Sequence, residues 1–134
     1  MKRSFPVIDS DGHILERDHE LREYLPPEFR AVPGKREYPL FSWDGWARGG
    51  LSPHKREHPS VELWLRFLDA TEIALTVLYP NEGLNIGLQR DRDWAVGLAH
   101  AYNDWLHHDF LSVSARFQGV TLLAPQEPAE AAKE

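Results

Sequence analysis

The sequence contains no cysteine, which excludes a disulfide framework, a thiolate metal site and a cysteine nucleophile. Any metal must therefore be bound by nitrogen and oxygen ligands. The sequence also lacks an apolar run close to the roughly 18 residues of a membrane span, and no apolar stretch of signal-peptide length stands near the N-terminus. These two absences lead us to expect a cytoplasmic protein that does not contact a membrane.

A basic surface stripe is absent as well. The net charge is −6, and lysines and arginines are scattered among the carboxylates. A phosphate backbone has no surface on which to lie, so nucleic acid is excluded as a partner. What is present is typical of one folded domain: 134 residues, of which 42% are hydrophobic, with five tryptophans.

Apolar strand patterns alternate along the chain with helical patterns. Strands are predicted at residues 5–9, 73–80 and 116–125. Helices are predicted at 17–30, where Pro26 and Pro27 stop the helix, at 60–71, from Asp91 or Asp93 onward, and after Pro128. The helix that begins at Asp91 or Asp93 has one apolar face, formed by Trp94, Leu98, Tyr102, Trp105 and Leu106. This alternation indicates an α/β fold made of parallel βαβ units. Between the first two helices, residues 31–59 form a long loop without periodicity, which we interpret as an insertion in a single domain spanning 1–134.

Two architectures fit this order of elements. A (β/α)8 TIM barrel needs about 250 residues, so the chain would supply about the first three of its eight units. A small open parallel sheet would be nearly complete with the elements present. The pattern of residues leaves both open.

The segment "VIDSDGHILE", residues 7–16, places several metal-binding residue types at the end of the first strand. Asp9, Asp11 and His13 have the i, i+2 spacing that puts side chains on one face of a strand, and Glu16 follows one turn later. Carboxylates and neutral imidazole suit zinc, manganese or iron. The alternative is a polar turn in which the aspartates cap the next helix and the histidine is merely hydrogen-bonded.

Several segments together resemble a known family. "VIDSDGHILE", "EYLPPEFR", "FLDATEIALTVLYP", "AYNDWL" and "RFQGVTLLAPQEPAEAAKE" are similar, in order and spacing, to the N-terminal portion of the amidohydrolase-2 family. This family contains metal-dependent TIM-barrel hydrolases and decarboxylases of the aminocarboxymuconate-semialdehyde decarboxylase type. The resemblance implies the barrel, of which this chain carries only the first three or so units.

The resemblance also implies a metal site. The family's first strand ends in two metal-binding histidines, and here Asp11 stands at the first of these positions and His13 at the second. Glu16 matches a following acidic residue and is the third expected ligand. Zinc is the first expectation, with manganese or iron as alternatives. Further histidines and a late aspartate of the family lie on strands that this chain does not contain, so no catalytic residue is assigned.

For function, the resemblance implies the N-terminal part or subunit of an enzyme that hydrolyses or decarboxylates a small, carboxylated substrate. In such enzymes the metal activates a water molecule or orients the substrate. Tyr79, at the end of the second strand, and Trp43 and Trp46, in the long loop, are the candidate substrate contacts. A second subunit or a homo-oligomer would complete the barrel, and the isolated chain would have little activity. The alternative is a truncated, non-catalytic module that self-associates or binds a partner subunit.

Overall fold

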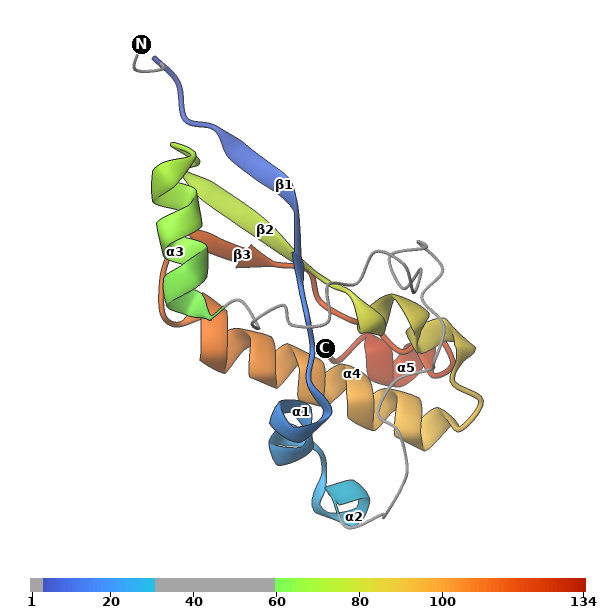
Figure 1. Cartoon of the computed structure of the whole chain (residues 1–134). Helices are drawn as coiled ribbons and strands as arrows, with labels where there is room; N and C mark the ends of the chain where they lie inside the picture. The colour runs from blue at the N-terminus through green and yellow to red at the C-terminus, as the bar shows by residue number, and fades with distance from the viewer. Residues whose placement is uncertain (1–3, 31–59) are drawn as a thin grey trace, which may run out of the picture.

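A parallel three-stranded sheet forms the centre of the fold. The computed structural model describes residues 4–30 and 60–134. Strands β1 (Ile8–Ile14), β2 (Leu75–Pro80) and β3 (Phe117–Gly119) lie side by side in that order (Figure 1). Parallel strands joined through helices confirm the predicted α/β class, and they correspond to the first units of a partial barrel.

Helical segments connect and follow these strands. They are α1 (Asp18–Tyr24), α2 (Pro27–Arg30), α3 (Val61–Ala70), the 3₁₀ helix η1 (Glu82–Leu88), α4 (Arg92–Leu106), the π-helical turn η2 (His107–Leu111) and α5 (Pro128–Ala131). None of the helices in the described segments is both long enough and apolar enough to cross a membrane.

The longest helix, α4, begins and packs as its sequence predicts. The Asp91 carboxylate accepts a hydrogen bond from the Trp94 backbone N–H at 3.1 Å, as an N-cap residue does. The predicted apolar face is buried along its whole length, including Leu98, Tyr102 and Trp105. Helix α1 lies against α4 (Figure 1).

The two faces of the sheet differ in what covers them. On one face Ile14, Leu78 and Phe117 are buried in a cluster with the apolar residues of α1 and α4. On the other face, which we call the open face, Tyr79 is half-buried and Ile8 is 56% exposed. Side chains alternate between the faces along β2, as expected for a pleated strand.

Two predicted strand ends were wrong, and one predicted helix is followed by a second one. Strand β1 does not end at Asp9 but continues through the glycine-containing segment to Ile14. The first predicted helix, α1, ends before Pro26 and Pro27 as expected, but Pro27 begins a second short helix, α2, that was not expected. Strand β3 covers only Phe117–Gly119 of the predicted 116–125. The predicted loop at 31–59, with Trp43 and Trp46, lies outside the described residues.

Candidate functional site

The candidate metal-binding segment contains a β-bulge. In the pairing of β1 with β2, Asp9 lies opposite Thr76 and Gly12 lies opposite Leu78. Ser10 and Asp11 therefore both stand against the single residue Val77. The Asp9 carboxylate accepts a hydrogen bond from the Asp11 backbone N–H at 3.1 Å, which satisfies an amide that the bulge removes from the regular ladder.

The bulge separates Asp9 from the other two residues of the triplet, so the prediction that all three share a face was wrong. The Asp9 carboxylate accepts a hydrogen bond from the Thr76 hydroxyl at 2.8 Å, and Thr76 is fully buried. A Cβ built on Gly12 would also point at Thr76 and Asp9. Asp9 and Gly12 thus both face the helices although they are three positions apart, a spacing that would put them on opposite faces of a regular strand.

Asp11 and His13 come together on the open face. Asp11 Oδ1 lies 3.6 Å from His13 Nε2, and the two side chains are 87% and 31% exposed. Two ligands held about 2.1 Å from a tetrahedral zinc ion are about 3.4 Å apart, so this separation fits a shared ion. The predicted pairing of these two side chains is present in the structure, whereas metal binding itself stays a prediction.

A backbone carbonyl defines the protonation of the His13 ring. Nδ1 of His13 lies 3.0 Å from the Pro80 carbonyl oxygen, and a carbonyl can only accept a hydrogen bond. Nδ1 therefore carries the proton, and in the neutral ring Nε2 presents a lone pair toward Asp11. Histidines that bind metals are commonly held in this way, with the second ring nitrogen donating to a carbonyl or carboxylate.

Tyr79 lies beside this pair. It is opposite His13 in the register of β1 and β2, and the two rings are 5.9 Å apart between centroids. The structure thus places the predicted substrate contact Tyr79 next to the predicted ligand His13, at the carboxyl ends of neighbouring strands. In open and barrel α/β folds, this edge of the sheet is where ligands bind.

The Glu16 carboxylate lies elsewhere and has other partners. It accepts hydrogen bonds from three successive backbone N–H groups, those of Asn81 (3.1 and 3.2 Å), Glu82 (3.1 Å) and Gly83 (2.9 Å). Burial raises the pKa of Glu16 above its ordinary value, and the amide donors oppose that rise. Its charge also adds to burial in raising the pKa of Tyr102, a buried residue of α4.

Within residues 4–30 and 60–134, no three histidine, aspartate or glutamate side chains form a group that would hold a metal. Asp11 and His13 are thus two donors of the right chemistry, and Glu16 is not assembled with them. A stable zinc site has three or four protein ligands, so the remaining ligands would have to come from outside the described segments.

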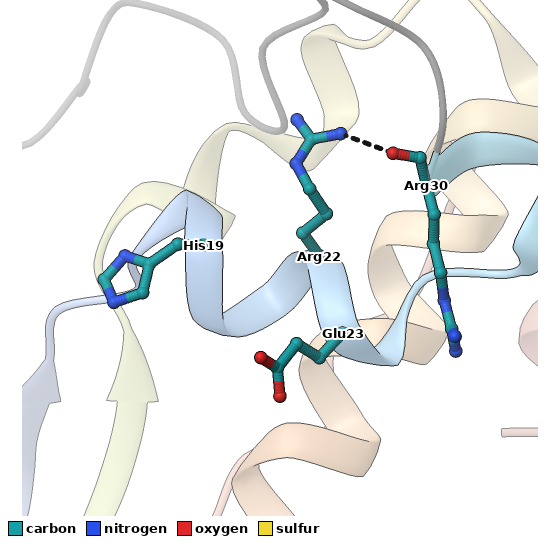
Figure 2. A pocket seen from close by; sticks show the side chains of 4 residues that line it. All are labelled: His19, Arg22, Glu23 and Arg30. Carbon is teal, nitrogen blue, oxygen red and sulfur yellow. Dashed lines mark hydrogen bonds between the residues drawn. The ribbon is translucent and has the colours of Figure 1, made fainter.

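A surface hollow beside α1 is separate from this site. His19, Arg22, Glu23 and Arg30 line it (Figure 2), and Arg22 Nη1 donates to the Arg30 carbonyl at 3.0 Å. None of the predicted site residues is among these four.

Two features of the site were missed by sequence reasoning. One is the pair of the half-buried Asp9 and the buried Thr76. A signal for it was present, because Thr76 is the lone threonine in the apolar run "IALTVLYP", and a buried hydroxyl needs a partner. The other is the set of backbone groups at 80–83, which contact His13 and Glu16. Main-chain donors and acceptors are common to nearly all residue types, so no sequence motif could have indicated these contacts.

Comparisons with known proteins point to one fold. No protein-family model and no curated protein sequence matches the chain. Among solved structures, it is similar to an amidohydrolase from Mycobacterium avium subsp. paratuberculosis, with a TM-score of 0.67 and 18% sequence identity over 98% of this chain. The match covers 46% of the amidohydrolase, so the chain spans less than half of that protein's length. The chain thus has the fold of part of an amidohydrolase.

Proposed function

We propose that this chain is the N-terminal part, or one subunit, of a metal-dependent enzyme of the amidohydrolase-2 family, which acts on a small carboxylated substrate. The observation that carries the proposal is the pairing of Asp11 with His13 at the carboxyl end of β1, with Nδ1 of His13 on the Pro80 carbonyl and Nε2 directed toward Asp11. The similarity to an amidohydrolase over nearly the whole chain supports it.

Asp11 and His13 would hold the ion, which we expect to be zinc, with manganese or iron as alternatives. When bound, a divalent ion of this kind activates water for hydrolysis or holds a substrate carboxylate during decarboxylation. The protein's own contribution is positional. The Pro80 carbonyl keeps Nδ1 of His13 protonated, and Tyr79 presents its ring beside that of His13.

A further subunit or a continuation of the chain is part of the proposal. Among the described residues, β1 and β3 each pair with a strand on one side only, and Ile8 is 56% exposed on the open face. Unpaired strand edges beside exposed apolar side chains favour association. The same observation favours the second candidate function, a non-catalytic module that self-associates.

Zinc binding by the purified 134-residue chain tests the proposal. We expect calorimetric titration to give one zinc per chain or per assembled site, and we expect Asp11→Ala and His13→Ala each to weaken binding at least about tenfold, since each removes one of few ligands. Binding should depend on pH because the imidazole must be neutral.

The control is His100→Ala. His100 lies on α4 with Asp104 at 3.5 Å and Glu134 at 2.8 Å, so it is also a histidine beside carboxylates. Zinc affinity that is lost in the His100 variant and retained in the Asp11 and His13 variants would contradict the proposal. A chain that binds no zinc, manganese or iron and forms a stable homo-oligomer by sedimentation would support the non-catalytic module.

A further inference from the structure

Glu16 and His13 are attached to opposite ends of one peptide unit. The Pro80 carbonyl accepts the hydrogen bond of His13 Nδ1 at 3.0 Å, and the Asn81 N–H donates to both oxygens of Glu16. That carbonyl and that N–H belong to the same planar trans peptide, so neither can turn without the other. The orientation of the carbonyl that fixes the His13 ring is thus coupled to the carboxylate of Glu16.

The two residues that hold this peptide unit are close in sequence, and the backbone groups that they bind follow the neighbouring strand. His13 and Glu16 are three residues apart at the end of β1, and they hold residues 80–83 at the end of β2. Glu82 and Gly83 also donate their N–H groups to Glu16. Three amides on one carboxylate fix the course of the backbone directly after Pro80, whereas a single hydrogen bond would leave it free to rotate.

Gly83 allows this close approach. A Cβ at this position would lie 3.0 Å from Glu16 Oε1 and 2.8 Å from the Pro80 Cβ, distances at which a side chain would have to displace its neighbours. It would also lie 3.1 Å from the buried Leu122. The Glu16 carboxylate therefore lies on the core side of the strand ends, away from the open face that carries Asp11 and His13.

We propose that Glu16 is a positioning residue: by holding the amides of residues 81–83, it orients the Pro80 carbonyl that keeps His13 protonated on Nδ1 and presents Nε2 to the metal. The inference rests on the proposed function for the metal, but the positioning itself is a property of the metal-free chain. It assigns Glu16 a role that differs from the ligand role expected from the sequence.

The test reads the tautomer of His13 directly. Long-range ¹H–¹⁵N correlation spectra of the histidine-labelled, metal-free chain distinguish a protonated Nδ1 from a protonated Nε2, at about pH 8, above the ordinary imidazole pKa of about 6.5. In the unaltered chain we expect His13 to be protonated on Nδ1. In Glu16→Ala we expect the two tautomers to be mixed, as in a free imidazole. In Glu16→Gln, which keeps one acceptor oxygen, an intermediate result is expected.

Asp91→Ala is the matched control. It also removes a carboxylate that accepts a backbone N–H, at the start of α4, and it should leave the His13 tautomer unchanged. If Glu16→Ala does not fold, as judged by circular dichroism, Glu16→Gln and Gly83→Ala decide the matter. A His13 tautomer that is the same in every folded variant of Glu16 and Gly83 overturns the proposal.

Zinc titration then separates this inference from the proposed function. Removal of a group that orients a metal-binding histidine typically weakens metal binding about 10- to 100-fold, and we expect this for Glu16→Ala together with the tautomer change. Weaker zinc binding with an unchanged tautomer would identify Glu16 as a ligand and overturn the positioning role. A tautomer change in a chain that never binds metal would leave the positioning role standing and contradict the proposed function.

Discussion

Asn103 shows how one side chain ends a strand. Its Nδ2 donates to the Leu122 carbonyl at 2.9 Å and its Oδ1 accepts from the Leu122 N–H at 2.8 Å. Both backbone groups of Leu122 are therefore used by a side chain of α4, and Leu122 itself is 7% exposed. The predicted packing of Tyr102 and Trp105 on the same helix is confirmed.

Asn103→Ala should destabilise the chain by about 2 to 3 kcal/mol, because two buried backbone groups lose their partners. Urea unfolding measures the change in the free energy of unfolding. Gln118→Ala, at an exposed position of β3, is the control and should stay within about 0.5 kcal/mol of the unaltered chain. Equal effects of the two substitutions would refute the role given to Asn103.

At the level of single residues, sequence reasoning succeeded where partners are neighbours on one strand. The spacing of Asp11 and His13 predicted their pairing because only Gly12 separates them. It did not find the partners of the Glu16 carboxylate, which lie 65 to 67 positions further along the chain. Contacts of that kind depend on how two strands align, and the residues involved here are backbone amides that any sequence would offer.

Among the elements, β1 is the one whose geometry matters most for the site. Gly12 lies in the strand directly between the two paired side chains and faces the helices. A Cβ there would lie in steric conflict with the buried Thr76 hydroxyl and 3.0 Å from the Val77 carbonyl oxygen. The first of these groups is held by Asp9 and the second belongs to the neighbouring strand, so neither can move away easily.

Gly12→Ala should therefore lower the free energy of unfolding by about 1 to 3 kcal/mol, as other substitutions that overpack a core do. It should also disturb the pairing of Asp11 with His13. Gly87→Ala in η1 provides the comparison, because a Cβ there would meet only Pro125 at 3.9 Å. Thermal unfolding followed by circular dichroism would contradict this account if the two alanines had the same effect.

The accuracy of the predicted elements followed the strength of their periodicity. Helix α4 carries its apolar face through four turns, and both its N-cap and its buried residues were predicted. Strand β3 was predicted too long because apolar residues continue past Gly119. Beyond Gly119 the Val120 backbone N–H still donates to the Leu78 carbonyl. The backbone N–H and carbonyl of Leu122 bind the Asn103 side chain instead, so the ladder of hydrogen bonds between the strands ends before Leu122.

For the molecule as a whole, the order of strands and helices was predictable from the alternation of patterns, since parallel βαβ units have few alternatives. A complete metal site could not be predicted, because the described residues bring together two suitable donors and a stable zinc site needs three or four. The structural similarity is to less than half of an amidohydrolase. Under the proposed function, further metal ligands would come from strands outside the described residues.

The free energy of unfolding of the whole chain should depend on pH through the buried carboxyl group of Glu16. Its pKa is raised from 4.5 by burial, so the native chain holds this proton to a higher pH than the unfolded chain does. The contribution of Glu16 to stability, relative to Glu16→Gln, should be greatest below about pH 4.5 and should be lost as the pH rises through the raised native pKa. Urea unfolding of both chains across this range measures it, and a difference that is independent of pH would contradict the expectation.

The bulge at Ser10 has a consequence for how such chains tolerate insertion and deletion. Losing one residue from a regular strand turns every later side chain to the opposite face. Here Ser10 and Asp11 share one position opposite Val77, so a chain without Ser10 would form a regular ladder with Asp9 still toward the helices and Asp11 and His13 still on the open face. The spacing between Asp9 and the paired residues Asp11 and His13 is therefore free to vary by one, and a search for related proteins that demands a fixed spacing would overlook chains with the same site.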